Sequence, residues 1–235
     1  MRHFVLLSGG LDSTTLLAWV AGRHPDEEIS TVTFAYGQKH AVEAQAARRV
    51  ADRYGVPNTL VELPHIRGSA LTDADRALPQ GRDLAQVEGI APSYVPARNL
   101  LFLAALASLA DAEGPAVLWL GVHRDDYTGY PDCRPEFVQA AGEAVRLGTR
   151  YGLRVEAPFV EWSKKDILEW GLAHEVPYEL THSCYQGEQP ACGVCDTCQA
   201  RLAAFAELGA RDPLAYRRAA HGSALDEPCS FEEQH

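Results

Sequence analysis

Residues 2–21 read RHFVLLSGGLDSTTLLAWVA, and this stretch decides the fold class. Its short apolar opening, residues 2–7, is typical of a buried parallel strand. Apolar residues at helical spacing predict a helix over residues 14–21. A glycine turn between a strand and a helix presents backbone N–H groups and a helix N-terminus to an anion, so this turn is a candidate phosphate site.

The same alternation continues along the chain. We expect further strands at residues 29–36, 58–63, 116–120 and 153–158, and further helices at residues 40–54, 97–112, 135–151, 163–174 and 197–208. Strands that alternate with helices predict an α/β fold with a doubly wound parallel sheet. Ser163 is a plausible N-cap for its helix. Residues 64–96 break the rhythm, and we interpret them as an excursion over the carboxyl edge of the sheet.

The composition is that of a globular protein. Of the 235 residues, 46% are hydrophobic and 23% are charged. The net charge of −11 disfavours a partner with a phosphate backbone, so no nucleic-acid partner is expected. The sequence has no run of 18 apolar residues, so no membrane span is predicted. The short apolar opening is unlike the core of a signal peptide. These features predict a cytoplasmic protein without a membrane partner.

The glycine loop, residues 8–15, carries groups that suit a phosphate. Two glycines let the backbone approach the ligand closely. Hydroxyl donors are supplied by Ser8, Ser13, Thr14 and Thr15. Asp12 would repel a phosphate unless a cation is present, which indicates Mg²⁺ nearby. The loop lacks the Gly-Lys-Ser/Thr ending of a P-loop and the G-x-G-x-x-G run of a dinucleotide site, which argues against kinases, GTPases and dehydrogenases.

Four of the six cysteines fall close together, at Cys184, Cys192, Cys195 and Cys198. Their C-x7-C-x2-C-x2-C spacing suits four thiolates around a tetrahedral Zn²⁺, with Zn–S distances of about 2.3 Å. Four thiolates leave no open position, so the metal would be structural. An iron–sulfur cluster and a redox dithiol remain alternatives. Cys133 is interpreted as a small buried thiol and Cys229 as an inert tail residue.

Several strings together carry a resemblance. They are SGGLDSTT at 8–15, YGQKH at 36–40, VPARN at 95–99, YTGYPDCR at 127–134, THSCY at 181–185 and CGVCDTC at 192–198. The first string resembles the ATP pyrophosphatase (PP-loop) superfamily. The complete set resembles, within it, the family of 7-cyano-7-deazaguanine synthases, over nearly the whole chain. The resemblance implies an adenine nucleotide α-hydrolase-like domain at residues 1–180 and a zinc-binding segment, closing helix and tail at residues 181–235, packed on the same domain.

That resemblance also implies a reaction, an ATP-dependent C–N ligation in queuosine biosynthesis. ATP adenylates 7-carboxy-7-deazaguanine, and ammonia displaces AMP to give an amide. A second ATP-dependent activation dehydrates the amide to the nitrile, 7-cyano-7-deazaguanine. A carboxylate is a poor electrophile and hydroxide a poor leaving group, and converting the oxygen to a phosphate ester removes both obstacles. The implied cofactors are ATP, Mg²⁺ and Zn²⁺, and the implied assembly is a homodimer.

Residue roles follow from the matched strings. Asp12, Ser13 and Lys164 are the candidate catalytic residues, with Lys164 offsetting the charge of the leaving pyrophosphate. The nucleotide cradle is assigned to Ser8, Gly9, Gly10, Leu11, Asp12, Ser13, Thr14 and Thr15. The alternatives are that Lys164 is a solvated surface lysine and that Thr14 merely starts a helix.

The substrate pocket is assigned to Tyr36, Gln38, Arg98, Asn99, Asp125, Tyr130 and Asp132. Either Asp125 or Asp132 could accept hydrogen bonds from N1–H and the amino group of a guanine-like ring, and a tyrosine could stack on it. The alternatives are a helix cap at Arg98 and a turn stabilised by aspartate and proline. His40 is equally a ligand contact or a helix-start residue.

Two other functions compete with this one. A tRNA thiolase would share the glycine loop but needs an RNA-binding surface and usually a catalytic cysteine, and the acidic charge weighs against it. A zinc-ribbon module that binds nucleic acid or a partner protein gains some support from nearby basic residues, namely Arg201, Arg211, Arg217 and Arg218. It would leave the nucleotide loop unexplained.

Overall fold

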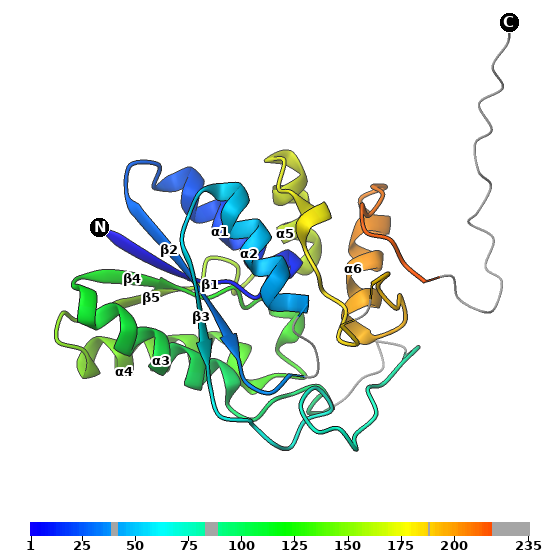
Figure 1. Cartoon of the computed structure of the whole chain (residues 1–235), viewed down its shortest axis with the longest axis horizontal. Coiled ribbons are helices and arrows are strands. Elements are labelled where there is room, and N and C mark those ends of the chain that lie inside the picture. Colours follow the sequence, from blue (N-terminus) through cyan, green and yellow to red (C-terminus); the bar gives the residue numbers. More distant parts are fainter. Residues whose placement is uncertain (39–41, 83–88, 188, 218–235) are drawn as a thin grey trace, which may run out of the picture.

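The computed structural model describes residues 1–38, 42–82, 89–187 and 189–217. The candidate residues His40, Arg218 and Cys229 lie outside these ranges. One parallel sheet runs through the molecule, with helices on both of its faces (Figure 1). The predicted α/β fold with a doubly wound parallel sheet is therefore confirmed.

The sheet has the strand order β3-β2-β1-β4-β5, and every pair of neighbours is parallel. The strands are β1 (Arg2–Leu6), β2 (Glu28–Ala35), β3 (Asn58–Glu62), β4 (Ala116–Trp119) and β5 (Arg154–Glu156). The middle strands β1 and β4 carry apolar runs, FVL and AVLW, because helices cover both faces of the sheet. The strand order reverses direction between β1 and β4, and ligands of such sheets bind at that point, outside the carboxyl ends of the strands.

Six α-helices surround the sheet within the described part of the chain. They are α1 (Leu11–Arg23), α2 (Val42–Tyr54), α3 (Arg98–Glu113), α4 (Pro135–Gly148), α5 (Lys164–Ala173) and α6 (Asp196–Glu207). None of the described helices is long and apolar enough to cross a membrane. Helices α1, α2 and α5 lie on one side of the sheet and α3 and α4 on the other, with α6 beside α5 (Figure 1).

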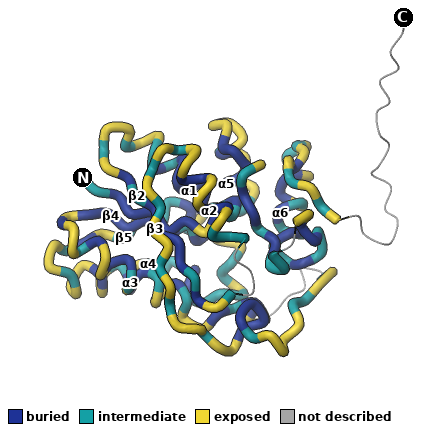
Figure 2. Tube along the Cα trace, in the orientation of Figure 1, coloured by how far each residue is buried: buried dark blue, intermediate teal, exposed yellow. Residues whose placement is uncertain are grey.

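The alternation of side chains along β1 builds two cores, one on each face. Val5 and Leu7 pack with α1, α2, α5 and α6, whereas Phe4 and Leu6 pack with α3 and α4. Figure 2 shows the central strands β1, β2 and β4 buried between helices whose outer faces are exposed, whereas the edge strands β3 and β5 are partly exposed. Because α6 contributes Ala204 and Phe205 to the first core, the C-terminal helix belongs to the body of the protein.

Helix α1 starts earlier than predicted. It begins at Leu11, three residues before the expected start, with Gly10 as its N-cap in extended conformation. Asp12 therefore lies in the first helical turn, where the partial positive charge of the helix stabilises a carboxylate. Residues 11–15 of the glycine loop therefore form the start of α1. Their positions around the helix axis decide which of their side chains face the core and which do not.

The excursion at residues 64–96 contains neither a β-strand nor an α-helix in its described parts. It reaches the cysteine segment, where Gly81 N donates to the carbonyl of Val194 at 2.8 Å and Gln80 forms a β-bridge with Cys195. Arg82 also forms an ion pair with Asp196 at the start of α6. The excursion therefore joins the sheet body to the C-terminal part of the chain.

Gly9 lies in close contact with α2. Its φ of +81° is in the left-handed region that favours glycine. A Cβ at this position would lie 2.4 Å from Ala47 N and 2.7 Å from the carbonyl oxygen of Glu43. The first glycine of the loop is therefore required for the packing of the loop against α2.

We expect Gly9→Ala to destabilise the protein by about 2–4 kcal/mol, because it adds a steric overlap to an unfavourable φ. Urea unfolding measures the change. The matched control is Gly22→Ala near the end of α1, where a Cβ would meet nothing within 4 Å and helix propensity predicts a gain of up to about 1 kcal/mol. Equal stabilities for the two variants would contradict this role of Gly9.

Candidate active site

A cavity of about 910 Å³ lies at the carboxyl ends of the strands. Its walls come from the glycine loop, the ends of β1 and β2, the first turns of α2, α3, α5 and α6, and the segment that follows β4. The volume falls in the range of ligand pockets. Segments that are distant in the sequence therefore converge on one site at the point where the strand order reverses.

The glycine loop contributes Ser8, Gly10, Asp12 and Ser13 to the cavity wall. The hydroxyls of Ser8 and Ser13 share a hydrogen bond at 3.0 Å, and Gly10 N donates to Ser8 Oγ at 3.3 Å. These hydroxyls and N–H groups form a polar concave surface beside the N-terminus of α1, which is suited to an anion.

The two threonines of the loop lie differently from the serines. Thr14 and Thr15 are fully buried. Thr15 Oγ1 donates to the carbonyl of Leu11 at 2.9 Å and shares a hydrogen bond with the Tyr178 hydroxyl at 2.8 Å. The side chain of Thr15 is therefore part of the core, because the early helix start turns this position inward. The predicted role of the Thr15 hydroxyl as a phosphate donor is wrong.

Asp12 and Lys164 form an ion pair on the cavity wall. Lys164 Nζ lies 2.8 and 2.7 Å from the two carboxylate oxygens of Asp12. Burial alone would raise the pKa of Asp12, but the positive charge of Lys164 and the neighbouring His123 hold that pKa far below its ordinary value. The interpretation of Lys164 as a solvated surface lysine is wrong, because this side chain faces the glycine loop.

His123 is a site residue that the sequence analysis missed. It is buried, and its Nε2 lies 3.3 Å from an Asp126 carboxylate oxygen and 3.7 Å from one of Asp12. Burial would lower the pKa of His123, but the carboxylates of Asp126 and Asp12 raise it above the ordinary value. A single histidine in a loop carries no spacing signal, so only the fold reveals this position.

The N-terminus of α5 is fixed by two carboxylates. Ser163 is the N-cap, as predicted, and forms a capping box with Asp166. Asp125 accepts a hydrogen bond from Lys164 N at 2.9 Å. The structure thus brings Asp125 to the backbone of the candidate catalytic lysine.

Asn99 and Asp132, both predicted in the substrate pocket, contact each other. Asn99 N donates to Asp132 Oδ2 at 2.8 Å, and Asn99 Nδ2 donates to the carbonyl of Asp132 at 2.9 Å. Both side chains are buried. The same amide contacts Cys133 Sγ at 3.4 Å, and burial raises the pKa of that thiol, so it stays protonated. The buried thiol expected at Cys133 is confirmed.

Arg98, Tyr36 and Tyr130 all line the cavity. Arg98 Nη1 donates to the Tyr36 hydroxyl at 3.1 Å, and the Tyr130 hydroxyl shares a hydrogen bond with Ser93 Oγ at 2.6 Å. Gln38 also lines the cavity, but its amide bonds both Tyr36 N, at 2.7 Å, and the carbonyl of Phe34, at 3.2 Å. Gln38 therefore closes the end of β2, and Arg98 presents its charge to the cavity.

Glu43 is the second site residue that the sequence analysis missed. It lies in the first turn of α2 and lines the cavity. Burial raises the pKa of its carboxyl to about 7, although the charge of Arg98 acts in the opposite direction. The only sequence signal was its position at the start of the helix that follows β2.

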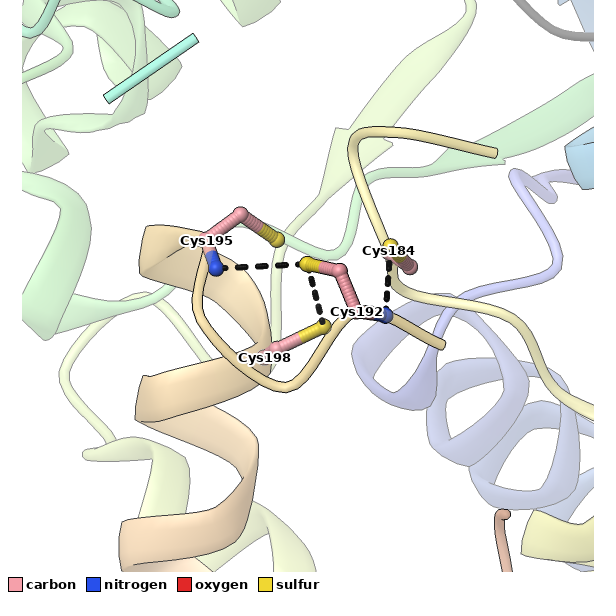
Figure 3. Close-up of side chains that lie close together, drawn as sticks. All are labelled: Cys184, Cys192, Cys195 and Cys198. Carbon is pink, nitrogen blue, oxygen red and sulfur yellow. Dashed lines mark hydrogen bonds between the residues drawn. The ribbon is translucent and has the colours of Figure 1, made fainter. Parts of the chain in front are cut away.

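The four predicted cysteines meet in one cluster (Figure 3). All four are buried, and their Sγ atoms lie within 4.8 Å of one another. Cys192 and Cys198 have sulfurs 3.9 Å apart, close to the edge of about 3.8 Å of a tetrahedron with Zn–S bonds of about 2.3 Å. Hydrogen bonds from Cys195 and Cys198 hold the pKa of Cys184 far below its ordinary value. The cluster can therefore bind a metal ion.

Arg201 does not belong to an exposed basic patch. It is buried, its Nε and Nη2 donate to Asp212 at 2.6 and 2.9 Å, and its Nη1 donates to Thr181 Oγ1 at 2.6 Å. The guanidinium thus ties α6 to the segments on either side of it. The support that Arg201 appeared to give to a nucleic-acid-binding module is removed.

A glycine loop without a P-loop lysine, placed where a parallel sheet reverses its strand order, is the arrangement of the ATP pyrophosphatase (PP-loop) class of enzymes. A family model described as "Queuosine biosynthesis protein QueC" matches residues 2–209. The chain belongs to this family of queuosine biosynthesis enzymes.

Curated relatives with the name 7-cyano-7-deazaguanine synthase match most of the chain. The protein of Thermoplasma volcanium is 43% identical over 224 residues, which cover 92% of this chain and 91% of that relative. The protein of Nostoc punctiforme is 43% identical over 225 residues, which cover 92% of this chain and 100% of that relative. The solved structure of the U34-tRNA thiolase NcsA from Methanococcus maripaludis aligns with a TM-score of 0.48 at 13% identity, over 77% of this chain and 58% of that chain.

We expect Lys164→Met to destabilise the protein by about 1–3 kcal/mol at neutral pH, because Asp12 loses its closest cation in a half-buried setting. Urea unfolding measures the effect, and Asp12→Asn in the same background should recover part of it. Lys165→Met is the control, because Lys165 is the exposed neighbour. A loss of equal size in the control would disprove the importance of the pair.

Proposed function

We propose that the protein converts 7-carboxy-7-deazaguanine and ammonia to 7-cyano-7-deazaguanine, with two ATP-dependent activations and an amide intermediate. The observation that carries the proposal is the convergence of the glycine loop, Lys164 and Arg98 on one cavity of about 910 Å³. That volume is suited to a nucleotide beside a bicyclic base. The relatives are named 7-cyano-7-deazaguanine synthase, which supports 7-cyano-7-deazaguanine as the product.

In this proposal the glycine loop binds the pyrophosphate of ATP. Ser8, Gly10 and Ser13 line the cavity and supply hydroxyl and N–H donors. Asp12 would hold Mg²⁺, which neutralises phosphate charge when bound. Lys164 lies against the loop and would stabilise the negative charge that develops on the leaving pyrophosphate.

The base would occupy the part of the cavity near Arg98. This guanidinium bonds Tyr36 but has no carboxylate partner within 4 Å among the residues that the structure describes, so it can pair with the carboxylate of the substrate. Tyr130 offers a ring for stacking. Gln38, Asn99 and Asp132 shape the wall through the bonds described above, and Asp125 positions the backbone of Lys164.

We propose Zn²⁺ for the cysteine cluster, held by Cys184, Cys192, Cys195 and Cys198 as a structural ion. Four thiolates match the preference of Zn²⁺ and leave no position for a substrate. The homodimer, ammonia as the nitrogen donor and the cytoplasmic location remain predictions that rest on the sequence and the family resemblance.

Incubation of the protein with 7-carboxy-7-deazaguanine, ATP, Mg²⁺ and ammonium should give the amide and then the nitrile, with AMP as the nucleotide product. Mass detection follows all three compounds. We expect Ser13→Ala to lower kcat by on the order of 10²–10³, because it removes a hydroxyl group from the wall of the proposed phosphate site.

The matched control is Ser108→Ala on the exposed side of α3, which should leave the rate unchanged. ADP as the only nucleotide product, in step with the nitrile, would rule out the adenylation mechanism.

Removal of the metal should unfold the C-terminal part of the protein, because metal binding at such a site is coupled to folding. Cys195→Ser should lose the metal, the soluble yield and stability. Cys133→Ser, which changes a buried thiol outside the cluster, should retain one equivalent of zinc per chain. Elemental analysis decides the outcome, and iron with sulfide in place of zinc would identify a cluster instead.

A further inference from the structure

Four of the six carboxylates that line the cavity in the described part of the chain have a partner within the protein. Asp12 is bonded by Lys164, and Asp126 lies beside His123. Asp125 accepts from the backbone of α5, and Asp196 is held by Arg82. These four carboxylates have hydrogen-bonding or charged partners before any ligand arrives.

Two carboxylates on the cavity wall lack such a partner among the described residues, those of Glu43 and Glu207. Glu207 lies at the exposed end of α6, where water solvates it. Glu43 is half-buried in the cavity wall, and the burial of its carboxyl group raises its pKa to about 7. A carboxylate that faces a cavity, partly removed from water and without a donor, is best explained by a ligand that brings its own donors.

The surroundings of Glu43 place it next to both parts of the site. Its backbone carbonyl lies against Gly9 of the glycine loop, which binds the nucleotide in the proposed function. Its carboxyl group is close enough to the Arg98 guanidinium for the charge to affect its pKa, and Arg98 in turn bonds Tyr36. A base held between Glu43 and Arg98 would therefore lie beside the loop where its carboxylate must be adenylated.

A guanine-like ring presents two neighbouring donors on one edge, N1–H and the 2-amino group. The two oxygens of a carboxylate match that pair of donors, whereas an amide or an arginine does not. The other candidates for this contact were Asp125 and Asp132, and both accept backbone hydrogen bonds that fix the starts of α5 and α3. The carboxylate of Glu43 accepts no backbone hydrogen bond among the described residues, so it is available to a ligand.

We propose that Glu43 recognises the base by accepting hydrogen bonds from N1–H and the 2-amino group of the deazaguanine ring. This inference rests on the proposed function and adds to it the residue that selects a 2-amino-4-oxo ring. Arg98 then faces the opposite, carboxylate-bearing part of the substrate. Glu43 is a specificity residue in this arrangement and takes no part in bond-making.

The test combines one variant with one change in the substrate. Glu43→Gln keeps the size of the side chain but turns one acceptor into a donor that opposes the ring. We expect kcat/KM for the base to fall by about 10–100-fold, with the KM for ATP unchanged, because a bidentate pair contributes about that much discrimination. The analogue that lacks the 2-amino group should be a similarly poor substrate for the wild type and should lose little further in Glu43→Gln.

Asp52→Asn is the matched control, because it removes a carboxylate from an exposed position of the same helix. It should leave both kinetic constants unchanged. The analogue also tests the wild-type protein directly, so the inference remains testable if Glu43→Gln folds poorly. Equal kcat/KM values for the base and the analogue in the wild type would overturn the inference and leave the proposed function intact. A wild-type protein that neither binds nor converts the base would overturn the proposed function and this inference together.

Discussion

The contact between Asp12 and Lys164 joins the first turns of two helices, α1 and α5, that are 152 positions apart in the sequence. Moving either charge out of water has a large cost, and the close approach of the two offsets it. The N-termini of α1 and α5 both face the cavity and give it a partial positive charge. An unpaired lysine would add to that charge, and the site would then attract any anion. The Asp12 carboxylate balances the charge of Lys164, so the lysine is held at the cavity wall before any ligand arrives.

Packing places this pair where it can act. The contact of Gly9 with Ala47 sets the distance between the glycine loop and α2, which in turn places Glu43 beside the loop. The capping box of Ser163 and the hydrogen bond from Lys164 N to Asp125 orient α5. Glu43 and Lys164 are therefore positioned by backbone contacts that are complete without a ligand, which is the usual meaning of a preorganised site.

The sequence predicted the sheet because β1 and β4 contain short apolar runs, β2 is rich in β-branched and aromatic residues, and helical patterns separate the strands. It also predicted the cysteine cluster and the glycine loop, since local spacing carries both signals. The inward turn of Thr15 was missed, because it depends on a helix start three residues earlier than the pattern indicated. His123 and Glu43 were missed for another reason. A single titratable residue has no period, and its role emerges only when strands far apart in the chain meet at one edge.

The glycine loop lies near the N-terminus, but some of its hydrogen-bond partners lie far along the chain. Its Gly9 carbonyl accepts a hydrogen bond from His182 N at 2.8 Å, and Leu11 N contacts Ser183 Oγ at 3.5 Å, across a separation of 172 residues. The cysteine segment that follows reaches the excursion through Gly81 and Gln80. During translation the glycine loop therefore lacks this support until about four fifths of the chain has emerged. Closing a loop of this length has an entropic cost in folding.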